Sequence, residues 1–119
     1  TYLYEEEDGK LVFAGFLIKF HPDKNVLLPN FLKFYTETNW YWNWVEIYSA
    51  RTGQPGINEN EYRFLQLPIP LIEEQKLIVQ RLISLSNNIE AETNSLIKFK
   101  DLKKGLMEDL LTGKVEVEV

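Results

Sequence analysis

Residues 72–111 have the sequence IEEQKLIVQRLISLSNNIEAETNSLIKFKDLKKGLMEDLL, and this stretch decides what kind of fold the chain adopts. No proline interrupts it, Glu73 and Glu74 stand in its expected first turn, and Gly113 follows its end. Carboxylates complement the dipole at a helix N-terminus, and glycine is common just after a helix C-terminus. The pattern predicts one unbroken α-helix over residues 72–111, about 60 Å long at a rise of 1.5 Å per residue.

Apolar residues recur in this helix at alternating steps of three and four, the heptad spacing of a coiled coil. A stripe of this length needs a second helix to cover it, because the remainder of the chain is too small to do so. The stripe also contains Glu92 and Lys103, which cost stability or set the register and direction of pairing. The apolar residues expected to pair with a partner helix are Ile78, Leu82, Leu85, Ile89, Leu96, Phe99, Leu106 and Leu110.

The residues before the helix have a different composition. Fifteen of the sixteen aromatic residues precede Leu67, and only Phe99 follows it. The segment Leu11–Phe20, LVFAGFLIKF, is rich in β-forming residues and stops at His21 and Pro22. Its near-continuous apolarity predicts a strand that is buried on both faces.

Short helices are expected between this strand and the long helix. Pro29 stands where a helix can begin, and apolar residues follow it at helical spacing as far as Tyr35. A second helix is expected over Trp40–Ser49, although the alternation of tryptophans at positions 40, 42 and 44 leaves a strand as an alternative there. Asn58 is expected to cap one helical turn that ends by Phe64, and residues 67–71, LPIPL, form an extended link.

Composition and charge limit the classes of function. The chain has 119 residues with 13 Lys and Arg, 18 Asp and Glu, and a net charge of −5, whereas a stand-alone DNA-binding domain is usually basic. If the chain contacts DNA, a local patch or a partner must therefore supply the phosphate contacts. Cysteine is absent, so disulfides and Cys-ligated metals are excluded. The longest apolar run is too short to span a bilayer, and we expect a cytoplasmic protein with no membrane contact.

No residue pattern indicates catalysis. The chain has a single histidine, His21, with no nucleophile beside it. The acidic residues 5–8 lack the alternating ligands and glycine of a calcium loop, so we expect a solvated turn there. No glycine-rich phosphate loop or methyltransferase motif occurs. We therefore expect no catalytic residue, no metal and no cofactor.

Polar residues after the second expected helix are the best candidates for contacting DNA. Arginine and the amide side chains of Gln and Asn form paired hydrogen bonds with guanine and adenine edges, while a Thr hydroxyl and glycine N–H groups hold phosphates. The alternative is an ordinary polar turn with helix caps. The candidates are Arg51, Thr52, Gly53, Gln54, Asn58, Asn60 and Arg63.

An aromatic cluster precedes these polar residues. Aromatic side chains at helical spacing are usually part of a core, and the alternative is a platform on which bases or sugars stack. Trp42 is the best candidate for an exposed ring, because Trp40 and Trp44 share the expected buried face. The cluster consists of Tyr35, Trp40, Tyr41, Trp42, Trp44 and Tyr48.

Three stretches resemble the specificity subunits of type I DNA restriction–modification systems. Residues 67–78, LPIPLIEEQKLI, are similar to the P-x-x-x-E-Q-x-x-I motif that opens the conserved helix of that family. Residues 102–115, LKKGLMEDLLTGKV, resemble the LKKGLMQDLLTGKV ending of the same helix, and residues 52–57, TGQPGI, resemble the loop before the opening motif. The stretches stand in the family's order, so the resemblance covers roughly residues 26–119.

The resemblance implies an α+β fold in three parts. Residues 1–69 form the C-terminal part of a mixed α/β target-recognition domain for DNA. Residues 70–113 form the conserved helix, which makes an antiparallel coiled coil with a partner helix, and residues 114–119 form a tail. Each part is an expectation that follows from the family.

The same resemblance implies a non-catalytic role in a larger complex. The chain is expected to read one half-site of double-stranded DNA and to dock methyltransferase subunits through its helix, beside restriction subunits. Two copies are also expected to associate through their helices. The alternative is a helix-pair dimerisation module without DNA binding of its own. A small hydrolase or carbohydrate-binding domain built on the tryptophans is a third hypothesis.

Overall fold

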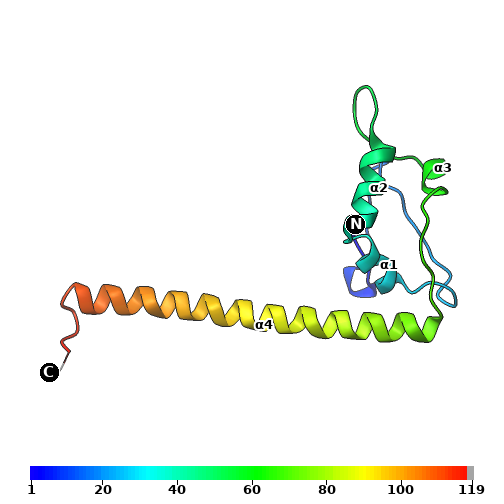
Figure 1. Cartoon of the computed structure of the whole chain (residues 1–119). Coiled ribbons are helices and arrows are strands. Elements are labelled where there is room, and N and C mark those ends of the chain that lie inside the picture. The colour runs from blue at the N-terminus through cyan, green and yellow to red at the C-terminus, as the bar shows by residue number, and fades with distance from the viewer. Residues whose placement is uncertain (118–119) are drawn as a thin grey trace. The chain divides into compact units, whose positions relative to one another are not determined.

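The computed structural model describes residues 1–117, and helices are the regular elements of this part of the chain (Figure 1). In chain order they are η1 (Glu6–Asp8), α1 (Pro29–Tyr35), α2 (Asn39–Ser49), α3 (Glu59–Tyr62) and α4 (Ile72–Leu111). The chain divides into two compact units, one from Thr1 to Gln80 and one from Arg81 onward. Within the described residues, no helix combines the length and apolarity needed to cross a membrane.

The long helix is confirmed as one continuous element. α4 begins at Ile72 and ends at Leu111, with Glu73 and Glu74 in its first turn. Gly113 has φ of 72°, a conformation that favours glycine, and the N–H of Lys114 donates to the carbonyl of Asp109 at 3.0 Å. These contacts end the helix where the sequence predicted. Of the expected tail, residues 114–119, the last two lie outside the described residues.

The predicted strand over Leu11–Phe20 is wrong, and with it the α+β fold class as far as residues 1–117 show. All ten residues are exposed, Val12 by 99% and Phe16 by 87%, so the expected burial on both faces is wrong too. A strand forms only when a neighbouring strand pairs with its N–H and C=O groups, and the described residues supply none. The chain instead bends at Ala14, whose carbonyl accepts from the N–H of Leu17 at 2.9 Å.

The shorter helices lie close to where the sequence placed them. Pro29 is the first residue of α1. Thr38 precedes α2, and its side chain accepts from the N–H of Tyr41 at 3.3 Å. Since α2 is helical, the strand alternative for this stretch is wrong. Asn58 caps α3 as predicted, because its Oδ1 accepts from the N–H of Glu61 at 3.0 Å.

A small apolar core holds the first unit together. Three buried residues define it: Leu27 from the loop before α1, Phe31 from α1 and Val79 from α4. Leu27 and Phe31 are close in sequence, whereas Val79 is far from both, so the core forms only when the first turns of α4 pack against α1 and the loop before it. Five partly buried apolar residues surround it: Leu28, Leu32, Phe34, Leu67 and Ile78.

Gln75 is a polar side chain at the edge of this core, and it has no exposed surface. Its Oε1 accepts from the N–H of Leu28 at 2.9 Å. Its Nε2 donates to the carbonyls of Val26 and Pro70, both at 2.8 Å. Leu28 is the residue before α1 and has no side-chain cap. Gln75 therefore satisfies backbone groups at the start of two helices at once.

An aromatic cluster joins α1, α2 and α3. The ring of Tyr41 lies 6.3 Å from that of Tyr35 and 6.2 Å from that of Trp44, while Trp44 stacks on Tyr48 at 4.8 Å. The hydroxyls of Tyr41 and Tyr62 are 3.0 Å apart. The cluster therefore orients α2 by the face that carries Tyr41.

The predicted buried face of α2 is wrong in part. Trp40, which was expected on the buried face, is 64% exposed, whereas Tyr41 is buried. The reason is that the aromatic partners of α2, on α1 and α3, meet the side with Tyr41, Trp44 and Tyr48. The prediction that Trp42 is exposed is confirmed, since it is 54% exposed.

Replacing Gln75 should destabilise the first unit. Gln75→Leu leaves the N–H of Leu28 and the carbonyls of Val26 and Pro70 without partners. We expect a loss of at least about 2 kcal/mol in the free energy of unfolding, because each buried, unpaired backbone group costs roughly 1–3 kcal/mol. Urea unfolding followed by tryptophan fluorescence measures it, since all tryptophans lie in this unit. The control is Gln80→Leu at an exposed position, and equal losses in both variants would contradict the assignment.

The Tyr41 hydroxyl should make stability fall at alkaline pH. Burial, together with the hydrogen bond to Tyr62, raises the pKa of Tyr41 above its ordinary value. The unfolded chain then loses this proton at about pH 10 while the folded chain keeps it, so the stabilisation present below that pH is lost as pH rises. Tyr41→Phe should show a shallower decline of unfolding free energy between about pH 9 and 11. Equal slopes in the variant and the unaltered chain would count against this.

Candidate nucleic-acid and helix-pairing surfaces

The loop between α2 and α3 carries the first group of candidate DNA contacts. Its base is closed by the N–H of Gly56, which donates to the carbonyl of Ser49 at 3.4 Å. Gly53 at its tip has a φ of 117°, a backbone conformation that residues with a side chain rarely adopt. Thr52 and Gln54, on either side of the tip, are exposed and form no side-chain hydrogen bond within residues 1–117. Both side chains are therefore accessible to a ligand.

Arg51 and Asn58 are held by the same carboxylate. The guanidinium of Arg51 forms an ion pair with Glu61, whose Oε2 also accepts from the N–H of Asn58 at 2.7 Å. The Oδ1 of Asn58 in turn accepts a hydrogen bond from the N–H of Glu61. This arrangement fixes the start of α3 against the loop. It favours the alternative of a capped polar turn for Asn58, while Arg51 keeps further N–H donors beyond the ion pair.

The two remaining candidates lie on or next to α3. Asn60 is exposed, and the Arg63 guanidinium lies 3.7 Å from the carboxylate of Glu59, with both side chains mostly exposed. No hydrogen bond or ion pair in the described part of the chain joins them to Thr52 or Gln54. Two arginines and two glutamates balance across residues 51–63. The surface is polar and accessible, but it carries no excess positive charge for phosphates.

The aromatic residues of α2 divide into two groups. Tyr41, Trp44 and Tyr48 stack within the cluster, as the core interpretation predicts. Trp40 and Trp42 are exposed, so stacking on a ligand stays an alternative for these two alone. His21, the single histidine, is exposed as well.

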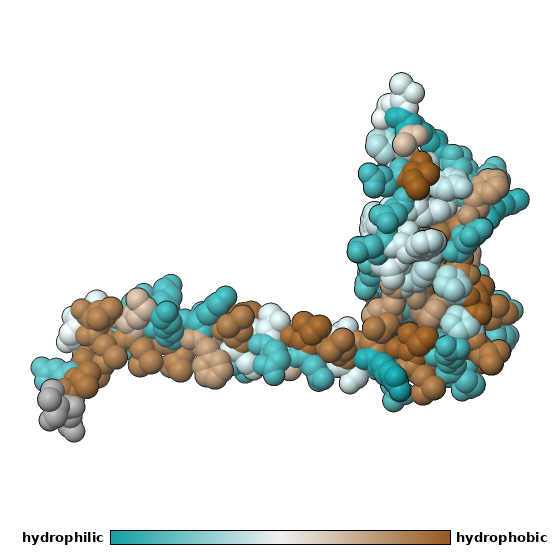
Figure 2. Space-filling model, in the orientation of Figure 1, coloured by the Kyte–Doolittle hydropathy of each residue, from teal (hydrophilic) through white to brown (hydrophobic). Residues whose placement is uncertain are grey.

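The candidate pairing face of α4 is exposed throughout the second unit. Exposed fractions run from 36% for Leu82 to 70% for Phe99. Figure 2 shows apolar side chains recurring along α4 and gathering toward its C-terminal end. An open groove near that end is lined by Phe99, Leu102, Lys103, Leu106, Met107, Leu110 and Leu111.

Ile78 differs from the other candidates for helix pairing. It packs against the core of the first unit and is partly buried there. The apolar stripe that lies open for a partner therefore consists of Leu82, Leu85, Ile89, Leu96, Phe99, Leu106 and Leu110.

Comparison with known families identifies the chain. A family model described as the type I restriction modification DNA specificity domain matches residues 2–100, well over half of the sequence. The chain belongs to this family. The match runs through the polar loop, α3 and most of α4, so a specificity domain contains all seven candidate DNA contacts.

Two relatives are specificity subunits by name. The type I restriction enzyme MjaVIII specificity subunit of Methanocaldococcus jannaschii is 37% identical over 67 residues, which are 56% of this chain and 16% of that protein. The type I restriction enzyme StySPI specificity subunit of Salmonella potsdam is 24% identical over 103 residues, 87% of this chain and 22% of that protein. The chain thus spans about a fifth of the length of these relatives. No solved structure matches it.

Two residues, Gln75 and Glu61, make structural contacts that the sequence patterns did not predict. The sequence analysis included Gln75 in the E-Q motif but predicted no contact for it. Its spacing from Ile72 and Val79 is a signal for a position on the buried face of the helix. Glu61 lies three residues after Asn58, the spacing of a capping box, which is a signal for its reciprocal bond. Its ion pair with Arg51 joins residues ten positions apart, and no local pattern encodes that contact.

Proposed function

We propose that this specificity domain is a DNA-recognition and scaffolding part of a type I restriction–modification complex. The match of the family over residues 2–100 carries the proposal. In it, residues 1–69 belong to a target-recognition domain, residues 70–113 form a conserved helix and residues 114–119 a tail. The chain itself is non-catalytic, and partner chains transfer methyl groups from S-adenosylmethionine or cleave DNA.

The polar loop supports a role in reading one DNA half-site. Gln54 and Thr52 are accessible at its tip, and an amide side chain pairs with the edge of adenine in the major groove. Arg51, Asn60 and Arg63 lie nearby in sequence as secondary contacts. Because the chain carries a net charge of −5, the modification subunits supply most of the phosphate contacts in this proposal.

The apolar stripe of α4 supports a role in docking. Seven large apolar residues lie exposed in it, and water contact over such a face is unfavourable, so a covering helix stabilises it. Four lysines, at positions 98, 100, 103 and 104, lie on the same stretch and suit an acidic surface on a methyltransferase subunit. The long helix thus pairs with a partner helix and holds the modification subunits.

A second candidate function is a helix-pair module without independent DNA binding. Two observations favour it: the charge balance across residues 51–63, and the use of Arg51 and Asn58 in contacts with Glu61. In that case the partner helix and modification subunits bind this chain, and the DNA contacts lie elsewhere in the complex.

DNA reading should depend on Gln54. The chain mixed with its cognate modification subunits should retain duplex DNA in a salt-dependent manner, measured by electrophoretic mobility. Gln54→Ala should lower the preference for target over non-target DNA by about tenfold, within the roughly 1–3 kcal/mol of one paired base contact. The control is Gln66→Ala, whose side chain is also exposed and makes no hydrogen bond in the described structure. Failure to form a complex and to retain DNA would contradict the DNA-recognition function.

Self-association should depend on the apolar stripe. Leu96→Asp places a charge in the middle of it and should shift the chain to the monomer in sedimentation velocity, because an unpaired carboxylate between helices is costly. Asn94→Asp introduces the same group on the outward side of α4 and should leave association unchanged. An oligomer unaffected by Leu96→Asp would show that another surface mediates it.

A further inference from the structure

The guanidinium of Arg51 is held by a carboxylate that has a second, independent anchor. Arg51 forms an ion pair with Glu61 through its Nη2, and the same oxygen of Glu61, Oε2, accepts from the N–H of Asn58 at 2.7 Å. The Oδ1 of Asn58 accepts from the N–H of Glu61 at 3.0 Å. The capping box therefore fixes the carboxylate beside the first turn of α3, and its position does not depend on Arg51.

Arg51 keeps hydrogen-bonding capacity beyond this ion pair. A guanidinium has five N–H donors in a rigid plane, and within residues 1–117 only the bond to Glu61 uses one of those on Arg51. The side chain of Arg51 is 41% exposed, whereas that of Glu61 is 29% exposed. Glu61 is thus the more enclosed partner, and Arg51 has both unused donors and exposed surface for a ligand.

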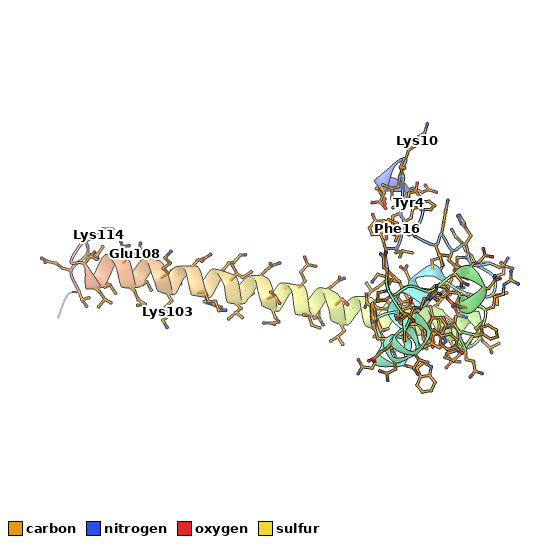
Figure 3. All side chains as sticks on the ribbon, turned by 90° about the horizontal axis from the view of Figure 1, so that it is seen from above. Tyr4, Lys10, Phe16, Lys103, Glu108 and Lys114 are labelled. Carbon is orange, nitrogen blue, oxygen red and sulfur yellow. The ribbon has the colours of Figure 1, made fainter. Side chains whose placement is uncertain are left out.

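Pairing with a carboxylate is not a general property of the basic side chains of this protein. Lys10 and Lys103 form no ion pair within residues 1–117, and Figure 3 shows both side chains extending away from the ribbon. Such cations are available to any anion in solution. Arg51 differs from them because a carboxylate of the same chain already neutralises its charge.

The ion pair next to it in the sequence is weaker. The guanidinium of Arg63 lies 3.7 Å from the carboxylate of Glu59, one helical turn away, and both side chains are mostly exposed. Exposed pairs of this kind contribute little, because water and salt screen them. Glu61, in contrast, is tied to the backbone and holds its arginine at a defined place.

This ion pair affects a phosphate contact and a base contact of Arg51 differently. A phosphate on another edge of the guanidinium would lie within roughly one Debye length of the Glu61 carboxylate, about 8 Å at physiological salt, so the two anions would repel. An arginine that is already neutralised also releases fewer counter-ions from DNA. The O6 and N7 atoms of guanine are neutral acceptors, so the unused N–H groups of Arg51 can bind them without this repulsion.

We propose that Glu61 is a positioning residue that directs Arg51 toward guanine edges and away from phosphates. This assignment rests on the DNA-recognition function proposed above, and it adds a residue that sets the specificity of that function. The ion pair persists in the complex, and Arg51 reads a base through its remaining donors. Binding to non-target DNA gains little from the charge of Arg51. Since specificity is the ratio of target to non-target affinity, Glu61 raises it by weakening the non-target term.

Removing the charge of Glu61 tests this assignment. Glu61→Gln keeps an acceptor for the N–H of Asn58, because glutamine also serves at this position of a capping box, but it no longer neutralises Arg51. With the cognate modification subunits present, non-target duplex should bind about fivefold more tightly at about 50 mM salt. The slope of log affinity against log salt should steepen by about 0.9, the contribution of one phosphate contact. Fluorescence anisotropy of a labelled duplex measures both quantities.

Glu46→Gln is the matched control. Glu46 is exposed on α2 and forms no ion pair within the described residues, so its replacement changes the net charge equally without releasing an arginine. The salt slope of this variant should equal that of the unaltered chain. An equal steepening in Glu46→Gln and Glu61→Gln would assign the effect to net charge and overturn the proposal.

Arg51→Gln tests the same ion pair from the other side and leaves the capping box intact. If Glu61 keeps Arg51 from phosphates, this variant should lower the preference for target DNA about tenfold, the loss of one base contact, with an unchanged salt slope. A slope that is shallower by about 0.9 would show that Arg51 binds a phosphate in the unaltered chain, against the proposal. In the double variant Arg51→Gln with Glu61→Gln, the gain in non-target affinity should disappear.

The outcomes separate this assignment from the proposed function. If the unaltered chain and its modification subunits retain no target DNA, the DNA-recognition function is overturned, and the role of Glu61 with it. If they retain target DNA with the expected preference, that function stands. Binding that is then unchanged in Glu61→Gln or in Arg51→Gln would overturn the role of Glu61 alone.

Discussion

The first unit depends on three hydrogen bonds made by one carboxamide. Gln75, on the first turns of α4, satisfies the N–H before α1 and two carbonyls that would otherwise be buried without partners. Leu27, Phe31 and Val79 form a core of only three buried residues around this contact, so little else fixes α1 against α4. A leucine fits the volume but cannot both donate and accept. The glutamine of the E-Q motif thus has a physical role in joining helix to loop.

α4 combines two kinds of surface in one element. Its first turns carry Gln75 and Val79 into the core of the first unit, and Ile78 is drawn in beside them. From Leu82 onward the apolar side chains lie exposed on a stripe with one acidic and one basic residue. A helix that is apolar on one side and uncovered is suited to a partner of the same kind. One continuous helix therefore contributes both to the small core of the first unit and to a long exposed apolar stripe.

The polar region between α2 and α3 contains both residues with structural contacts and residues without them. Asn58 and Glu61 form a capping box, and Arg51 joins it through an ion pair, so three polar side chains stabilise the turn. The exposed tip, held by the positive φ of Gly53, leaves Thr52 and Gln54 accessible. The side chains at the tip are therefore the ones in this region that make no structural contact in the described chain.

Local signals in the sequence determined the helices of this protein, and the tertiary structure decided which of their faces are buried. Helical hydrogen bonds join residues four apart, so the absence of proline in residues 72–111, the cap at Asn58 and the stop at Gly113 were sufficient to predict α3 and α4. The apolar run Leu11–Phe20 predicted a strand wrongly, because a strand needs partners from elsewhere, and the described chain offers none. Likewise, Tyr41 rather than Trp40 is buried, and Ile78 packs against the core instead of lying on the exposed stripe. Both outcomes depend on contacts with residues that are distant in sequence. Periodicity marks a helix and its apolar side, whereas burial depends on where the rest of the chain packs.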